Sequence, residues 1–144
     1  ADVNRAKREL ERLKRIAKSE GMWDDVRLRD EIAKLEVDVV ALEMLVLRVL
    51  SAEKFGKNPL DIAGLLKIKG SEIQQRYSEL MMLAVGPYAL PFIQEAMEAG
   101  WQGEYVGAAY AAPLAPTYFN YRKTTIYGGS NEVQRNIVAQ TVLG

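Results

Sequence analysis

DDVRLRDEIAKLEVDVVALEMLVLRVLSAEK, residues 24–54, is the stretch of sequence that decides the fold. Its apolar residues recur at steps of three and four, which predicts one long helix that begins at Asp24 or Asp25 and runs to about Lys54. These apolar positions include Ile32, Leu35, Val39, Leu42, Leu45, Val46, Val49 and Leu50. Between residues 37 and 50 they cover more than one stripe, so we expect neighbours on two sides of this helix. Phe55-Gly56 ends it.

The residues before this helix have the same kind of spacing. An apolar series predicts a helix over residues 3–19, with Gly21 as its stop: Val3, Ala6, Leu10, Leu13, Ile16 and Ala17. No capping pattern precedes this series. We therefore expect the helix to begin inside a longer one, and residues 1–144 to form a single domain of a longer protein.

A third long helix follows a short connector. Asn58-Pro59 supplies an N-cap and a first-turn proline, and Gly86-Pro87 stops the helix after about Val85. Its expected buried residues are Leu65, Ile68, Ile73, Tyr77, Leu80, Met81 and Leu83. Three small residues, Gly64, Gly70 and Ser71, would let neighbouring helices approach closely.

The remainder of the chain is less regular. Prolines punctuate residues 86–117, where a short helix over Phe92–Ala99 is the main expectation. A further helix is predicted over about Thr117–Thr125. Ser130 then caps a last helix that runs to Val142. No segment has the pattern of a strand, so the sequence predicts an all-α antiparallel bundle.

Composition excludes several classes of function. Lys plus Arg number 19 and Asp plus Glu number 19, and this zero net charge argues against a nucleic-acid or membrane-surface binder. The chain has no Cys and no His, which excludes disulfides, serine–histidine triads and zinc sites of the usual kinds. Acid–base chemistry would fall to Asp, Glu, Lys or Tyr. No apolar run is long enough to span a membrane, and a cytoplasmic location is expected.

The first eighteen residues are nevertheless basic. They contain Arg5, Lys7, Arg8, Arg12, Lys14, Arg15 and Lys18. The simpler interpretation is the solvated face of a helix. A phosphate-binding role is the alternative.

The segment Tyr127-Gly128-Gly129-Ser130-Asn131-Glu132 carries the most chemical information. The two glycines would let a ligand approach the main chain, and the following helix would direct free N–H groups at that ligand. A carboxylate at Glu132 suits the first turn of a helix. From the residues alone, the simpler interpretation is a glycine hinge followed by a serine cap.

Residues 125–135, Thr-Ile-Tyr-Gly-Gly-Ser-Asn-Glu-Val-Gln-Arg, closely resemble the C-terminal signature of the acyl-CoA dehydrogenases. The resemblance extends over the order of the helices and implies the family's last domain, a four-helix bundle. Residues 5–10 and 66–76 suggest the large subunits of bacterial pimeloyl-CoA-type enzymes.

What the resemblance implies is α,β-dehydrogenation of an acyl-CoA, with FAD as cofactor and electron-transfer flavoprotein as acceptor. The implied substrate residues are Tyr127, Gly128 and Gly129, and the implied FAD residues are Ser130, Asn131 and Glu132. Met82 and Gly86 correspond to a segment that contacts FAD of a neighbouring subunit. A homo- or hetero-oligomer is therefore expected, as a dimer or a dimer of dimers.

The sequence also departs from the family's pattern. Many members have their catalytic Glu where this chain has Gly128, and others place the base on an earlier helix, which here would lie before Ala1. No catalytic residue is therefore expected within the chain. Two alternatives stay open: a non-catalytic supporting subunit of a heteromeric acyl-CoA dehydrogenase, and a helical interaction module.

Overall fold

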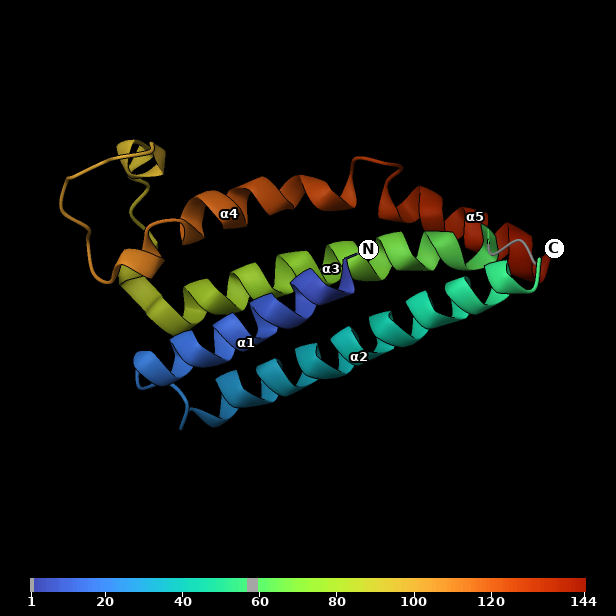
Figure 1. Ribbon diagram of the computed structural model, residues 1–144, viewed down its shortest axis with the longest axis horizontal. Coiled ribbons are helices and arrows are strands. Elements are labelled where there is room, and N and C mark those ends of the chain that lie inside the picture. The colour runs from blue at the N-terminus through green and yellow to red at the C-terminus, as the bar shows by residue number, and fades with distance from the viewer. Residues whose placement is uncertain (1, 57–59) are drawn as a thin grey trace.

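The computed structural model describes residues 2–56 and 60–144, and their regular structure is entirely helical. Helices α1 (Val3–Ser19), α2 (Val26–Lys54) and α3 (Leu60–Val85) alternate in direction. Helices α4 (Leu114–Tyr121) and α5 (Asn131–Leu143) follow one another along α3 and together form the fourth rod (Figure 1). The predicted antiparallel four-helix bundle is confirmed.

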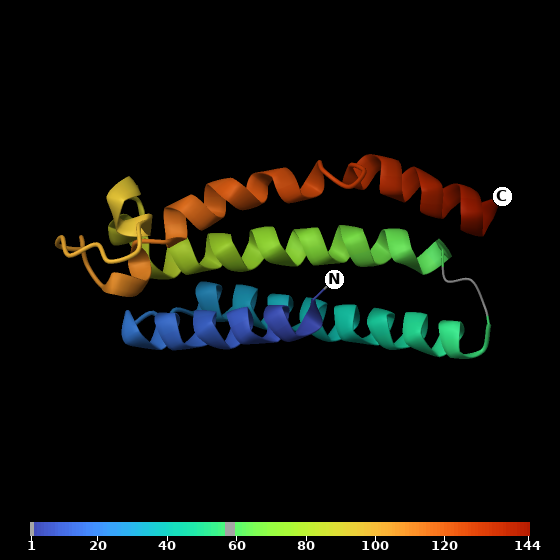
Figure 2. The same cartoon turned by 45° about the horizontal axis from the view of Figure 1, so that its top comes forward.

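Helix α3 is the centre of the bundle. It contacts α1 and α2 on one side and α4 and α5 on the other, as Figure 2 shows. The largest fully buried side chains come from α1, α2 and α3: Leu13, Leu35, Val39, Leu42, Ile73, Leu80 and Met81. Because α3 touches every other helix, residues along it can link the two ends of the fourth rod to the rest of the domain.

The helix starts are fixed by capping side chains. Asp25 caps α2 as predicted, and its Oδ1 accepts a hydrogen bond from the Leu28 N–H at 2.8 Å. The expectation that α1 lacks a cap is wrong, because Asp2 Oδ1 accepts from the Arg5 N–H at 2.9 Å. The predicted start signal at Asn58-Pro59 lies outside the described residues.

Two predicted short helices differ from the structure. Within residues 92–99 only Gln94–Met97 forms a 3-10 turn (η2), and Phe92 and Met97 are exposed, so no burial stabilises a longer helix there. The helix expected to begin at Thr117 begins at Leu114, and its last turn, Arg122–Thr125, is a 3-10 helix (η4). Prolines in the first turn do not prevent this early start, because their missing N–H groups would be unpaired there.

Two further 3-10 turns, η1 (Gly86–Ala89) and η3 (Ala109–Ala111), lie in the long connection from α3 to α4. Across residues 2–56 and 60–144, no helix combines the length and apolar composition that crossing a bilayer requires.

Part of the apolar surface is uncovered. Leu65 and Leu83, expected to be buried, are 37% and 58% exposed, because no described helix packs over those faces of α3. The second apolar stripe of α2 is also open to solvent, at Val37, Val40, Met44 and Leu47. Helix α2 contacts both α1 and α3, as expected of a helix with neighbours on two sides, but neither of them covers this stripe.

Candidate functional site at the start of α5

The glycine loop joins η4 to α5. Gly128 and Gly129 have φ values of +69° and +83°, in the left-handed region that strains residues with a Cβ. A Cβ built on Gly128 would meet no heavy atom within 4 Å. The chain therefore turns into α5 through two residues without side chains, and the space beside Gly128 is open.

The first turn of α5 is built from the predicted residues Ser130 and Glu132. Ser130 is the N-cap, and its Oγ accepts from the Val133 N–H at 3.4 Å. The exposed Glu132 carboxylate has a pKa below its ordinary value, because its own main-chain N–H and the Ser130 hydroxyl hydrogen-bond the charged form. Glu132 is therefore ionised at neutral pH and engaged by the helix start.

Asn131 faces the inside of the bundle. Its side chain is buried, and its Oδ1 accepts from Lys67 Nζ at 2.7 Å and lies 3.2 Å from Ser71 Oγ. Lys67 and Ser71 are four residues apart on α3, so they lie on one face of that helix. No site role was predicted for Lys67, although this i, i+4 spacing of polar residues in an apolar helix was a usable signal.

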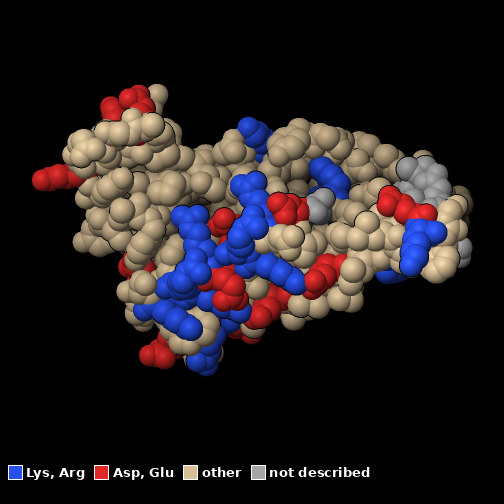
Figure 3. Space-filling view, in the orientation of Figure 1, with Lys and Arg blue, Asp and Glu red and all other residues tan. Residues whose placement is uncertain are grey.

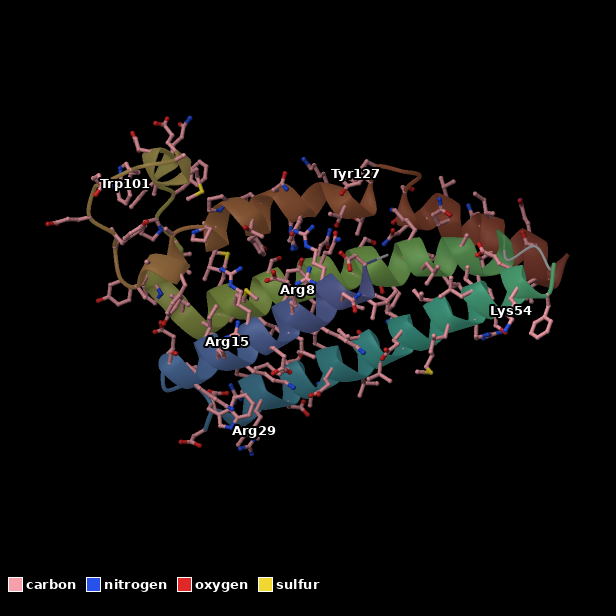
Figure 4. The ribbon with its side chains drawn as sticks, in the orientation of Figure 1. Arg8, Arg15, Arg29, Lys54, Trp101 and Tyr127 are labelled. Atoms are coloured by element: carbon pink, nitrogen blue, oxygen red, sulfur yellow. The ribbon has the colours of Figure 1, made fainter. Side chains whose placement is uncertain are left out.

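A cavity of about 200 Å³ lies between the glycine loop and α3. It is lined by Leu66, Lys67, Gly70, Ser71, Gln74, Thr124, Tyr127 and Gly128. The structure thus brings two of the three predicted substrate residues, Tyr127 and Gly128, to the same hollow. Tyr127 is 56% exposed and lies at the outer edge of the bundle (Figure 4).

A glutamine and an arginine hold the preceding turn against α3. Gln75 Nε2 donates towards the main-chain oxygens of Tyr121 and Arg122, at 3.0 and 3.3 Å. In return, an Arg122 Nη donates to the Gln75 main-chain oxygen at 3.2 Å, and its guanidinium lies 4.2 Å from the centre of the Tyr118 ring. This exchange fixes the approach to the glycine loop, and no role for Gln75 was predicted from the sequence.

The other predicted cofactor residues lie elsewhere. Met82 and Gly86 share a mainly apolar groove of about 430 Å³ with Glu79, Leu83, Leu90 and the two aromatic residues Tyr118 and Phe119. Eleven residues separate Ser71 from Met82, which corresponds to about 17 Å along the axis of α3. The predicted site residues therefore form two groups, one at the start of α5 and one at the end of α3.

Comparison with known proteins identifies the class to which this fold and loop belong. The sequence profile of the acyl-CoA dehydrogenase C-terminal domain matches residues 3–143, and the chain therefore belongs to the acyl-CoA dehydrogenase family.

Two mycobacterial proteins are similar to this chain in sequence. The chain is similar to the acyl-CoA dehydrogenase IpdE1 of Mycolicibacterium smegmatis, with 28% identity over 95% of this chain and 30% of the relative. It is also similar to IpdE1 of Mycobacterium tuberculosis, with 26% identity over 95% of this chain and 31% of that protein. The chain thus spans about a third of the length of these relatives.

Solved structures share the fold. The structure named "Tcur3481-Tcur3483 steroid ACAD" superposes with a TM-score of 0.76 over 99% of this chain and 34% of that chain, at 22% sequence identity. A variant of the same protein gives a TM-score of 0.75. At this identity the likeness supports the fold of the domain.

Proposed function

We propose that this chain forms the C-terminal domain of an FAD-dependent acyl-CoA dehydrogenase and contributes to binding of both the acyl-CoA and FAD. The observation that carries the proposal is the pair of positive-φ glycines immediately before the capped start of α5. The space beside Gly128 is open to a ligand, whereas the Gln134 side chain lies over Gly129 and donates to the Gly128 main-chain oxygen at 3.2 Å. The positive end of α5 at this loop favours electron-rich groups. A thioester and a flavin both present such groups.

The proposal assigns each residue by its place around the loop. Tyr127, Gly128 and Gly129 lie on the side of the acyl thioester. Ser130 and Glu132 contribute to FAD binding, together with the main chain of Asn131. The side-chain oxygen of Asn131 is not available for this role because it accepts a hydrogen bond from Lys67.

Met82 and Gly86 are assigned to the FAD of a neighbouring subunit. Their groove is apolar, contains two aromatic rings and lies apart from the glycine loop, so it can receive a flat ligand without competing for that loop. This assignment requires a homo- or hetero-oligomer, as a dimer or a dimer of dimers, with electron-transfer flavoprotein as the acceptor.

The catalytic base is proposed to lie outside this chain. Gly128 has no side chain, and the Glu132 carboxylate is engaged by the start of α5. FAD, when bound, accepts the hydride from the β-carbon of the substrate. The residues of this domain would orient the thioester and hold the flavin, while a carboxylate on another segment removes the α-proton.

A second candidate is a non-catalytic supporting subunit of a heteromeric enzyme. Gly128 favours it, because the chain lacks a base at that position. The name of the similar steroid ACAD structure, Tcur3481-Tcur3483, joins two designations, which also suits a heteromeric assembly. Single-turnover flavin reduction by the isolated full-length subunit separates the two candidates, because a supporting subunit gives none without its partner.

The substitution Glu132→Gln in the full-length protein tests the main proposal. Flavin content should fall, while the rate of single-turnover flavin reduction stays nearly unchanged once FAD is saturating. A loss of about a thousandfold in that rate would instead identify Glu132 as the base, because removal of a general base costs this much. If both the flavin content and the rate of flavin reduction are unchanged in this variant, Glu132 has no role in FAD binding or in catalysis.

A further inference from the structure

A small polar cavity lies between α1, α3 and α4, apart from the glycine loop. Its volume is about 100 Å³, which is room for a few water molecules or one small oxyanion. Its polar lining consists of Arg5, Glu9, Arg12, Tyr77, Ser78, Thr117 and Tyr121. The lining thus carries two guanidinium cations, Arg5 and Arg12, against one carboxylate, Glu9, and is net positive.

The cavity lining includes one buried hydroxyl group, that of Tyr77, that lacks a hydrogen-bond partner among the described residues. Tyr77 is 2% exposed, and its hydroxyl has no hydrogen-bond partner of acceptable geometry among the described residues. Burial and the neighbouring Tyr121 hydroxyl raise the pKa of Tyr77, so this group remains a donor at all physiological pH values. The nearby Tyr121 oxygen accepts from an Arg5 Nη and keeps a second lone pair, but it does not lie in acceptable hydrogen-bond geometry to the Tyr77 hydroxyl. A buried hydroxyl donor without an acceptor lowers the stability of the protein unless a hydrogen-bond acceptor binds beside it.

The charge of α1 points in the same direction. Arg5, Arg8, Arg12 and Arg15 follow one another at steps of three, four and three, which places them on one face of the helix. Within the described part of the chain, Arg12 is the only arginine of this row that has a carboxylate within ion-pair distance. Its partner is Glu9, at 3.4 Å. Figure 3 shows Lys and Arg side chains gathered on the face of the molecule over α1, with several Asp and Glu side chains among them. Of the row, Arg5 and Arg12 line the cavity itself.

We propose that this cavity is a binding site for a small oxyanion of carboxylate or phosphate type, held by Arg5, Arg12 and the Tyr77 hydroxyl. The anion would accept hydrogen bonds from both guanidinium groups and from the tyrosine, and would offset the positive row on α1. Two sources could supply such a group: a free small anion, or the carboxylate end of a longer molecule. The inference does not depend on the proposed dehydrogenase activity.

Isothermal titration calorimetry at constant ionic strength tests the site with acetate, inorganic phosphate and hexanoate as probes. The protein should show saturable binding with one site per chain. Arg12→Gln and Tyr77→Phe should each weaken binding by about tenfold or more, the value of a lost hydrogen bond to a charged group. Arg29→Gln is the matched control, because Arg29 is exposed on α2 and does not line the cavity.

Glu9→Gln gives the sharpest outcome. Removing the only competing carboxylate should strengthen anion binding, whereas a purely structural role for Glu9 predicts no gain. Far-ultraviolet circular dichroism checks that each variant is folded. If hexanoate binds more tightly than acetate, the natural ligand is the carboxylate end of a longer molecule. If the two affinities are equal, the natural ligand is a free small anion. Absence of saturable binding, or equal binding by all variants, would show that the cavity holds only water and would overturn the proposal.

Discussion

Lys67 Nζ in α3 donates a hydrogen bond to Asn131 Oδ1 at the start of α5, across 2.7 Å. This contact holds the proposed ligand-binding end of α5 from inside the bundle. Ser71 Oγ lies 3.2 Å from the same oxygen and 2.9 Å from the Ile68 main-chain oxygen, so its one hydroxyl hydrogen has two possible acceptors. The position of the glycine loop therefore depends on contacts that α3 makes with the first residue of α5.

Asn131→Ala removes this acceptor. Because Lys67 would then lose its acceptor and Ser71 would keep only the Ile68 main-chain oxygen, we expect the free energy of unfolding to fall by about 1–3 kcal/mol. Urea unfolding followed by circular dichroism measures the change. Asn136→Ala is the matched control, since Asn136 is exposed on the same helix. Equal losses in the two variants would show that the buried contact contributes nothing.

Ser130→Ala removes the cap of α5. The expected loss is about 0.5–1 kcal/mol, at the lower end of the range for capping residues, because the bond to the Val133 N–H is long at 3.4 Å. Ser130→Gly should cost less, as glycine is tolerated at this position. Thermal unfolding of the two variants side by side checks the order, and a larger loss for glycine would contradict it.

Gly64→Ala tests the close approach of α3 to α5. A Cβ at residue 64 would lie 2.9 Å from a methyl carbon of Val138, so one of the helices must shift. We expect a net loss of about 1–3 kcal/mol from overpacking, even though alanine favours helices. Adding Val138→Ala to the same protein should restore part of the loss. If the loss of unfolding free energy in the double variant equals the sum of the losses in the two single variants, positions 64 and 138 are not coupled.

The carboxylate of Glu132 should make stability depend on pH. Its pKa in the folded protein lies below the ordinary value of 4.5, because the helix start hydrogen-bonds the charged form. The stabilising effect is thus complete above the unfolded pKa and is lost as the pH falls through the lower folded pKa. The difference in unfolding free energy between the wild type and Glu132→Gln should shrink on acidification, and a constant difference would contradict this.

The isolated chain should self-associate and retain FAD poorly. Its apolar groove at Met82 and Leu83 and the open stripe on α2 expose large side chains that usually find partners. Sedimentation at increasing concentration and the visible spectrum after adding FAD measure the two properties. Leu83→Gln should reduce association if the groove is the contact, and a strictly monomeric wild type would refute the expectation.

The fold was largely predictable because its signals are local. The three long helices follow from apolar spacing, and the starts of α2 and α5 from Asp25 and Ser130. Asp2 was missed although it is a good capping residue, because only one residue precedes it. The start of α4 was placed late because Pro113 and Pro116 suggested an interruption, whereas prolines fit within a first helical turn.

The site was less predictable because its contacts join distant parts of the chain. The glycine loop can be found from sequence, but the pairing of Lys67 with Asn131 depends on how α5 lies along α3. Gln75 is ambiguous for the same reason, since nothing in its neighbourhood indicates that Tyr121 and Arg122 would lie beside it. The exposure of Leu83 depends on which helices cover α3, which helical spacing alone does not determine.

Because the space beside Gly128 is open, residue 128 is a position where a side chain can be gained or lost in evolution. A Cβ added there would meet no heavy atom within 4 Å, so the main cost of a substitution is the backbone strain of a positive φ, about 1–2 kcal/mol. That is small compared with rebuilding a packed helix. A loop of this shape can gain or lose a carboxylate by a single codon change while the bundle beneath it stays the same, so acid–base groups and scaffold can evolve independently.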